Sequence, residues 1–321
     1  MTPARLVRPA AFVAGATLLY TFPQWSDGWE SSRFATTVLR DILIFAILAL
    51  SLDLLVGHAG LPSLGHAAFY GAGAYAAAIA GQRFATDDLL VGLASAIAVA
   101  ALLALLIGFF AVRASGIFFL MLSLAFAQLV YAAAFQATDL TGGSNGFAGV
   151  RRPTFLGWDF SASASLYSLT VVVFLVVLAI VWRVTHSTYG RALSGLRENE
   201  RRMRALGYDT RALKLSAFVL AGAVAGVAGA LSAYAFRFVS PNDVALGRSI
   251  DAFVMVLIGG AGTLAGPVIG AGIVLYIDRV LSSAIGYSQT ILGVVFILFV
   301  LLARQGIVGL SRAVYARAQR R

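Results

Sequence analysis

Apolar runs long enough to cross a lipid bilayer recur along the 321 residues of this chain. The hydrocarbon core of a membrane requires about 17–25 predominantly apolar residues from each spanning helix. Hydrophobic residues make up 60% of the chain, and its mean hydropathy of +0.88 lies far above that of a soluble domain. The sequence therefore predicts an all-α, polytopic transmembrane helical bundle. A β-barrel is disfavoured, because its strands would alternate apolar and polar residues over roughly ten positions.

We predict about ten membrane segments, of which the eighth and ninth are short. The sequence GGAGTLAGP (Gly259–Pro267) separates these two with residues that a straight helix avoids. We predict a broken hairpin near 252–277 that dips into the membrane. We expect the first segment to be an uncleaved span rather than a signal peptide, since no clear small-residue cleavage site follows it. The predicted segments are Pro9–Phe22, Thr37–Val56, Gly65–Gly81, Leu89–Val112, Gly116–Gln136, Leu166–Trp182, Leu215–Phe236, Ala252–Gly260, Pro267–Ile277 and Thr290–Ala303.

The basic residues predict the orientation of these segments, because cytoplasmic loops carry an excess of Arg and Lys. One side of the predicted bundle holds 16 of the 24 basic residues: Arg5, Arg8, Arg113, the eight of 183–214, Arg304, Arg312, Arg317, Arg320 and Arg321. The other side holds five: Arg33, Arg83, Arg151, Arg152 and Arg248. Both termini are therefore expected in the cytoplasm. The net charge of +10 is explained by orientation in a membrane, without a nucleic-acid partner.

A charged island at 183–214 interrupts the apolar runs and carries 11 charged residues within 32 positions. Its apolar residues recur at helical spacing and predict one buried face. Gly207 suits the end of that helix, with basic residues in the last turns. Two interpretations stay open: a helix lying on anionic lipid headgroups, or a helix that couples the membrane domain to a cytoplasmic ATPase. The face consists of Ala192, Leu193, Leu196, Met203 and Leu206.

Few polar groups lie inside the predicted spans. Asp53 is either a protonatable relay or a structural carboxylate near the boundary, and we favour the structural role. Gln128 is expected to hydrogen-bond across helices, and His66 to be an interface residue rather than a metal ligand. His58 and His186 lack metal-ligand spacing, and the chain has no cysteine. A row of small residues predicts close helix packing: Gly65, Ala68, Ala72, Ala76 and Ala80.

Two further features bear on function. Lys214 is the only lysine and does not stand in a phosphate-binding G-x-x-x-x-G-K-[ST] motif, so any ATP hydrolysis must occur on another chain. The predicted outer loop at 137–165 contains TGGSNGFAG (Thr141–Gly149), whose Gly and Asn residues permit tight turns. This loop is either a plain connection or a docking or gate element.

Several stretches together resemble the permease subunits of branched-chain amino acid ABC importers, specifically the LivM type of the LivH/LivM family. They occur in the family's order along nearly the whole chain: LLVGHAGLPSLGHAAFYGAGAY, TGGSNGF, GRALSGLRENERRMRALGYDTRALKLSAFVLAGAVAGVAGAL, FVSPND and VLIGGAGTLAGPVIGA. The resemblance implies a single transmembrane permease domain over 1–321 in the bacterial cytoplasmic (inner) membrane, surrounded by membrane lipid. It also implies a transport subunit without an ATPase site of its own.

The resemblance further implies the partners and the site residues. The partners are a second permease subunit of the LivH type, two cytoplasmic ATPase subunits that use ATP and Mg, and an external substrate-binding protein. This chain itself is expected to hold no cofactor and no metal, and to have no catalytic residue. The expected coupling residues are Arg197, Glu198, Asn199, Glu200, Arg201, Ala205 and Gly207. The pathway or gate candidates are Asp53, Ser63, Gly65, His66, Gln128, Gly259, Gly260, Gly262 and Thr263. The outer-loop candidates are Thr141, Gly142, Gly143, Ser144, Asn145 and Gly146.

The chain departs from the family near one turn. The family usually has Asn where this chain has Asp53 and commonly Tyr where it has His58, and Pro62 is also atypical. Relatives that carry urea, short amides or other amino acids remain alternatives for the substrate. An ion-coupled secondary transporter is supported only by Asp53, and a membrane enzyme only by the pair Asp87–Asp88.

Overall fold

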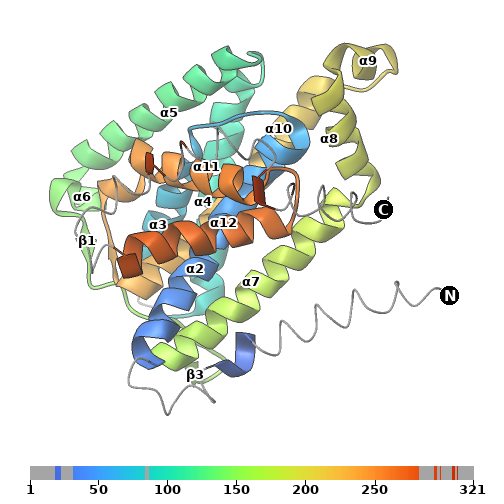
Figure 1. Cartoon of the computed structure of the whole chain (residues 1–321). Coiled ribbons are helices and arrows are strands. Elements are labelled where there is room, and N and C mark those ends of the chain that lie inside the picture. The colour runs from blue at the N-terminus through green and yellow to red at the C-terminus, as the bar shows by residue number, and fades with distance from the viewer. Residues whose placement is uncertain are drawn as a thin grey trace, which may run out of the picture.

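The computed structural model describes residues 19–22, 32–83 and 87–281, together with 293, 294, 297, 306, 307 and 309. Helices dominate this part of the chain (Figure 1). Five of them are long and apolar enough to cross a membrane: Arg33–Ala59, Leu89–Ala111 (α4), Ile117–Gln136 (α5), Ser163–Thr185 (α7) and Thr210–Phe236 (α10). The predicted helical membrane bundle is confirmed at this level. The count of ten stays a prediction, since most of 9–22 and 290–303 lies outside the described residues.

The first of these spans joins two elements, α2 (Ser32–Asp53) and a π-helical end, η1 (Leu54–Ala59). The predicted segment at 65–81 is α3 (His66–Arg83). The predicted broken hairpin is observed as two helices, α11 (Leu246–Gly259) and α12 (Ala265–Tyr276), which pack against each other. A second π-helical segment, η4 (Ile277–Leu281), follows α12.

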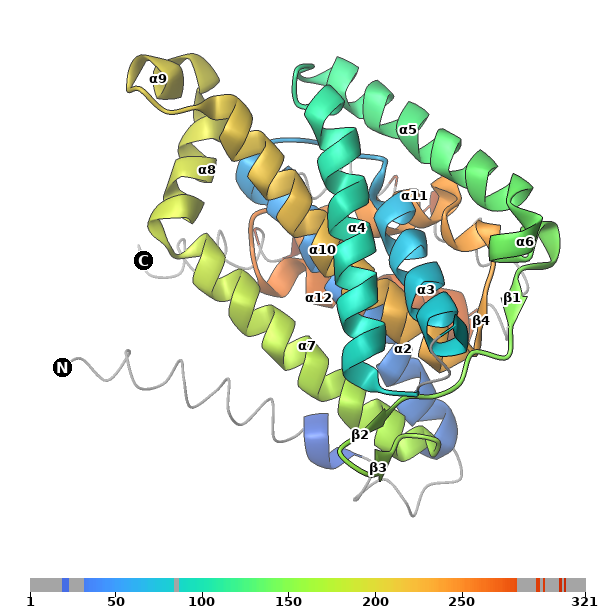
Figure 2. The same ribbon diagram turned by 180° about the vertical axis from the view of Figure 1, so that it is seen from behind.

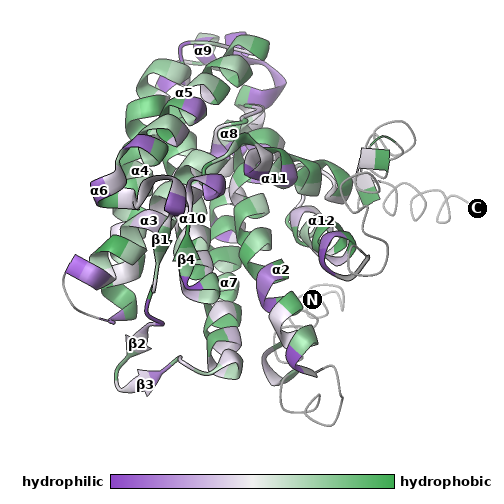
Figure 3. Ribbon diagram, turned by 90° about the vertical axis from the view of Figure 1, so that its left-hand side faces the viewer, coloured by the Kyte–Doolittle hydropathy of each residue, from purple (hydrophilic) through white to green (hydrophobic). Residues whose placement is uncertain are grey.

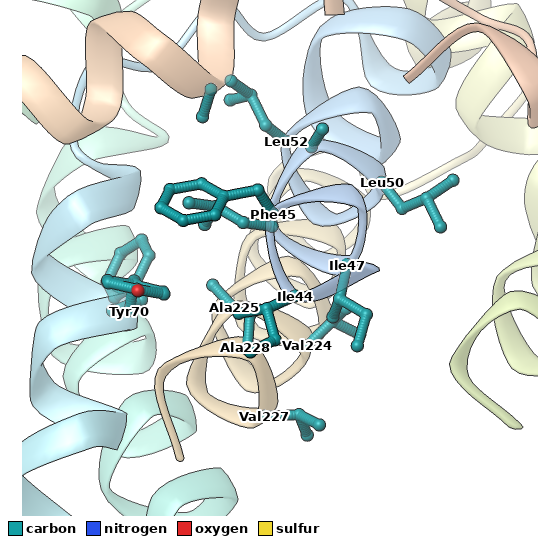
Figure 4. Packing of buried hydrophobic residues seen from close by; sticks show 14 of the residues in the cluster. Ile44, Phe45, Ile47, Leu50, Leu52, Tyr70, Val224, Ala225, Val227 and Ala228 are labelled. Atoms are coloured by element: carbon teal, nitrogen blue, oxygen red, sulfur yellow. The ribbon is translucent and has the colours of Figure 1, made fainter. Parts of the chain in front are cut away.

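The core surrounds α2, which packs against α7, α10, α11 and α12. Every residue from Ile44 to Leu52 is at most 2% exposed. A helix that is apolar on all sides belongs in an interior. Figure 4 shows Ile44 and Ile47 facing Val224, Ala225 and Ala228 of α10. By contrast, α4 and α5 keep much apolar surface exposed, as lipid-facing helices do.

Close packing of α3 on α10 relies on small residues, as predicted. One close approach runs through Gly73, one residue away from the predicted row, and another runs through Gly229, where an added Cβ would collide with the backbone of Tyr70. A Cβ added to Gly73 would collide with the backbone of Gly226, and one added to Gly226 would lie 2.6 Å from the Cβ of Ala100 on α4.

The charged island and the outer loop occupy different ends of the molecule. In Figure 2, α8 (Thr188–Glu198) and α9 (Glu200–Ala205) project at the top, whereas β2 (Thr154–Phe155) and β3 (Trp158–Asp159) lie at the bottom. Figure 3 shows hydrophilic residues gathered around α9 and α6 and hydrophobic residues along the long helices.

The outer loop is more ordered than a plain connection. It contains α6 (Thr138–Thr141), η2 (Gly143–Asn145) and β1 (Phe147–Ala148) before the β2–β3 hairpin. β1 pairs antiparallel with β4 (Phe238–Val239), which follows α10 and precedes η3 (Pro241–Asp243). This pairing ties the outer loop to the end of α10.

The expectation of one helix that runs through the charged island to Gly207 is wrong, because Asn199 divides the segment into α8 and α9. Asn199 is extended, with φ −160° and ψ 98°, and its side chain accepts a 3.0 Å hydrogen bond from the N–H of Arg202. It thereby caps a new helix. Gly207, with φ +86°, does follow the end of α9 as predicted.

The break also changes the buried face. Ala192, Leu193, Leu196 and Met203 are buried as predicted, but Leu206 is 66% exposed. The apolar spacing of the sequence runs past Asn199, but one continuous helix does not, so the buried stripe ends at Met203.

Candidate functional site: a joint between three segments

Three segments far apart in sequence meet at the end of α2. We call this contact the glycine joint and define it by Asp53, Gly57, Gly60, Arg197 and Gly262. It brings together η1, α8 and the turn between α11 and α12. Three of the five, Asp53, Arg197 and Gly262, are residues that the sequence singled out for the pathway or for coupling.

The α2 side of the joint is a short π-helix that ends at Gly60. Gly60 has φ +70°, a left-handed conformation that favours glycine. A Cβ there would also lie 3.2 Å from the Cα of Arg197. Single π-helical turns are frequent at functional sites, because they displace a backbone carbonyl from the regular helix pattern. Here the displaced region presents the carbonyl of Gly57 to α8.

Asp53 connects this helix end to the turn of the broken pair. Its carboxylate is 1% exposed, and Oδ1 accepts a 2.7 Å hydrogen bond from the N–H of Gly262. Oδ2 lies 3.6 Å from Nδ1 of His58. A buried carboxylate requires such partners. This geometry fits the structural role that we favour for Asp53, and the relay role stays the alternative.

Arg197 connects α8 to the same place. Its guanidinium donates a hydrogen bond to the carbonyl of Gly57. A Cβ added to Gly262 would lie 3.1 Å from Nη1 of Arg197. A charged donor on a backbone carbonyl is stronger than a neutral hydrogen bond. Arg197 therefore ties α8 to η1 and lies next to the turn at Gly262.

The turn itself is closed by its own polar groups. Thr263 Oγ1 donates to the carbonyl of Gly260 at 2.8 Å and accepts from the N–H of Gly266 at 3.0 Å. Gly260 and Gly262 have φ values of +110° and +79°. A Cβ on Gly259 would collide with the backbone of Gly266. The break is thus a tightly packed turn whose polar groups are largely paired internally.

A second contact braces α9 on α10. Glu200 accepts from Nζ of Lys214 at 2.8 Å and from Arg204 at 2.6 Å, and Thr210 lies 3.3 Å away. Burial acts to raise the pKa of Glu200, but the hydrogen bonds from Lys214 and Arg204 outweigh it and hold the pKa below its ordinary value. Sequence reasoning used Lys214 only to exclude a phosphate loop. A single lysine beside the apolar run of α10 could have predicted an ion pair with a nearby carboxylate such as Glu200.

Serine side chains satisfy the start of α3. Ser63 accepts from the N–H of Gly65 at 3.1 Å, Ser123 from that of Leu64 at 3.2 Å, and Ser249 from that of Ala67 at 2.9 Å. The first N–H groups of a helix need such acceptors. Ser123 and Ser249 belong to α5 and α11, so this helix start is held by two neighbours. Their role was not predicted from the sequence.

Two other candidates lie apart from the joint. His66 is fully buried and packs edge-on against Phe69, with ring centres 5.7 Å apart. Gln128 is exposed on α5. The structure does not bring Gln128 together with Asp53 or Gly262.

The outer-loop candidates form a compact turn at the opposite end. Thr141 Oγ1 lies 2.6 Å from the carbonyl of Ala134 and accepts from the N–H of Gly143 at 3.2 Å. Three of its glycines have positive φ: Gly142, Gly143 and Gly146. Ser144 and Asn145 at its tip are exposed.

The fold and the joint define a class: a multi-pass helical membrane protein with a charged segment tied to a broken helix pair. The chain belongs to the family described as branched-chain amino acid transport system / permease component, whose model matches residues 34–303.

Individual relatives agree with this family. The chain is 30% identical over 308 residues to the high-affinity branched-chain amino acid transport system permease protein LivM of Salmonella typhimurium strain LT2, covering 88% of this chain and 71% of that protein. Identity to LivM of Escherichia coli K12 is 30% over 309 residues, with the same coverage. LivH of Escherichia coli K12 matches at 31% over 156 residues, covering 47% of this chain and 50% of LivH. No solved structure matches the chain.

Proposed function

We propose that the chain is one of two permease subunits of an ATP-driven importer for branched-chain or other hydrophobic amino acids. The observation that carries this proposal is the match to LivM proteins along 88% of the chain. The subunit supplies half of a translocation pathway in the bacterial inner membrane and performs no chemistry itself. A LivH-type subunit supplies the other half.

Coupling to ATP is assigned to α8 and α9. Four of their apolar residues, Ala192, Leu193, Leu196 and Met203, are buried. Glu198, Asn199, Arg201 and Ala205 are exposed and free to meet two cytoplasmic ATPase subunits. Those subunits bind ATP and Mg. When the ATPase subunits move α8, the glycine joint carries this displacement to the turn at Gly262. We expect the gate of the pathway near this turn. The residues expected to form it are Gly262, Ser63, Gly65, His66, Gly259, Gly260 and Thr263.

The outer end is assigned to an external binding protein. Ser144 and Asn145 are exposed at the tip of the outer-loop turn, and the β1–β4 pairing fixes that turn to the end of α10. Docking there would reach α10 directly. Gln128 on α5 is the polar group proposed to face the second permease or the pathway, because an amide facing lipid would be costly.

The proposal is tested with the complete system in liposomes. Co-purification of ATPase subunits and leucine uptake that requires both ATP and the binding protein are expected. Uptake driven by an ion gradient without ATP would indicate a secondary transporter. Uptake of urea or short amides, with no uptake of leucine, would change the proposed substrate but leave the proposed ATP-driven importer in place.

The orientation is tested by labelling single cysteines, which is straightforward because the chain has no native cysteine. Ser144→Cys is expected to react with an impermeant maleimide added outside the cell. Arg202→Cys is expected to react only after the membrane is opened. The reverse pattern would place the coupling segment outside and contradict the proposal.

A further inference from the structure

A pocket of about 240 Å³ lies at the opposite end of the folded molecule from the glycine joint. Its walls come from the end of α3, the start of α4, the end of α10 and the segment from Phe147 to Pro153. The volume accommodates several heavy atoms, since about 10–15 Å³ of such space holds one water.

The pocket contains a carboxylate with a spare acceptor. The backbone carbonyl of Asp87 accepts from the N–H of Thr154 at 2.5 Å, which fixes Asp87 in place. Its Oδ1 is buried and has no hydrogen-bond partner in the part of the chain that the structure describes. A buried oxygen of this kind costs free energy unless a donor reaches it. The Asp87 side chain as a whole is 33% exposed, so an ammonium group in the pocket would meet the carboxylate at its exposed part.

A basic group stands beside this carboxylate. A guanidinium nitrogen of Arg151 lies 3.7 Å from Oδ2 of Asp87, and the Arg151 side chain is 72% exposed. This separation exceeds the 2.7–3.2 Å of an ordinary N–H···O hydrogen bond. The pair is therefore loose, and the planar guanidinium keeps donors available for a second carboxylate.

The remaining walls supply apolar contact. Ala77 and Ala78 of α3 and Phe147 of β1 line the pocket, and Gly92 and Tyr234 complete it. A Cβ on Gly92 would collide with the hydroxyl of Tyr234, so the glycine leaves room for that hydroxyl. Asp88 is committed elsewhere, because its carboxylate caps α4 through a 2.8 Å hydrogen bond from the N–H of Leu90.

We propose that this pocket binds a zwitterionic α-amino acid at the outer end of the permease. Asp87 receives the ammonium group, Arg151 receives the carboxylate, and Phe147 with the two alanines contacts the side chain. The identity of the ligand rests on the proposed function, whereas the pairing of charges rests on the pocket itself. The site would hold substrate after its release from the binding protein.

The test measures leucine binding to the purified complex in nanodiscs, without the binding protein, by calorimetry. Saturable binding is expected. Isoamylamine and 4-methylpentanoate, which each retain one of the two charges, are expected to bind at least about tenfold more weakly. This comparison uses the unaltered protein, so it does not depend on the folding of a variant.

Variants then locate the site. Asp87→Asn and Arg151→Gln are each expected to weaken leucine binding at least about tenfold. Arg152→Gln is the matched control, because Arg152 donates to the carbonyl of Ser161 and is not part of the pocket wall. Equal affinity for leucine and the single-charge analogues, or variants that bind like the wild type, would overturn the proposal.

Two further outcomes separate the pocket from the proposed function. If leucine does not bind, and the variants instead weaken capture of the binding protein, the pocket is a protein-docking socket and the proposal fails. If leucine binds in an Asp87-dependent manner but the complete system does not transport it, the pocket stands and the proposed function fails.

Discussion

The two ends of this permease use charge in opposite ways. At the glycine joint, Asp53 and Arg197 reach backbone groups on other segments, and Asp53 accepts at 2.7 Å from Gly262. At the pocket beside α3, α4 and α10, a guanidinium nitrogen of Arg151 lies 3.7 Å from the Asp87 carboxylate, and one carboxylate oxygen has no donor in the described residues. Satisfied charges fix segments together, whereas unsatisfied ones are available to a ligand. The comparison suggests a rigid link at one end and a receptive site at the other.

The largest effect is expected from Asp53→Ala. Removing the carboxylate leaves the buried N–H of Gly262 without its acceptor, which costs about 1.5–3 kcal/mol. Transport should fall at least about tenfold and the unfolding temperature should drop. Uptake assays and thermal unfolding in detergent measure both.

Asp53→Asn is the control for this prediction, because an amide oxygen can still accept from Gly262. Asn is also the usual residue at this position in the family, so near-normal transport is expected. Loss of transport in Asp53→Asn equal to that in Asp53→Ala would show that the charge matters rather than the hydrogen bond.

The next effect is expected from Gly262→Ala. Gly262 has φ +79°, which costs an L-residue roughly 1–2 kcal/mol, and its Cβ would lie 3.0 Å from the carbonyl of Gly57. Gly247→Ala on α11 is the matched control, since a Cβ there meets open space. Uptake and unfolding temperature should change only in Gly262→Ala. Similar behaviour of the two variants would mean that the joint is loosely packed.

Arg197→Ala is expected to have an intermediate effect of about 1 kcal/mol on stability. It removes the link between α8 and Gly57 while keeping the other exposed coupling residues, Glu198, Asn199, Arg201 and Ala205. ATP hydrolysis by the assembled complex should persist while transport falls. The double variant Glu198→Ala and Arg201→Ala should instead affect coupling at the surface that meets the ATPase. Unchanged transport in Arg197→Ala would break the proposed link.

The smallest effect concerns the brace at Glu200. Its pKa is lowered in the folded protein, so its contribution is present above the unfolded pKa and is lost as pH falls through the folded pKa. A partly exposed pair of this kind contributes about 1 kcal/mol or less. Unfolding temperature should decline slightly faster on acidification in the wild type than in Glu200→Gln. If the unfolding temperatures of the two proteins fall in parallel as pH is lowered, Glu200 does not contribute to stability.

The sequence predicted the elements of this structure better than their contacts. The apolar runs predicted the long helices, and GGAGTLAGP predicted the break between α11 and α12. The break at Asn199 was missed because apolar spacing continues past it, although Asn is a common helix cap. The bond from Gly262 to Asp53 joins positions 209 residues apart, and a single sequence carries no signal for such tertiary pairing. The loose pair Asp87–Arg151 was hidden for the same reason.

The burial of α2, complete from Ile44 to Leu52, has a consequence for biogenesis. The helix ends at Asp53, but α10, one of its main covering neighbours, begins only at Thr210. At about 5–20 residues per second, synthesis of the intervening chain takes roughly 10–30 s. During that interval α2 has lipid or the insertion machinery around it instead of its native neighbours. Its ion pair Arg40–Asp41, with a 2.8 Å contact, must remain shielded from lipid throughout this interval. Assembly of the bundle therefore depends on keeping α2 in place until α10 has been synthesised.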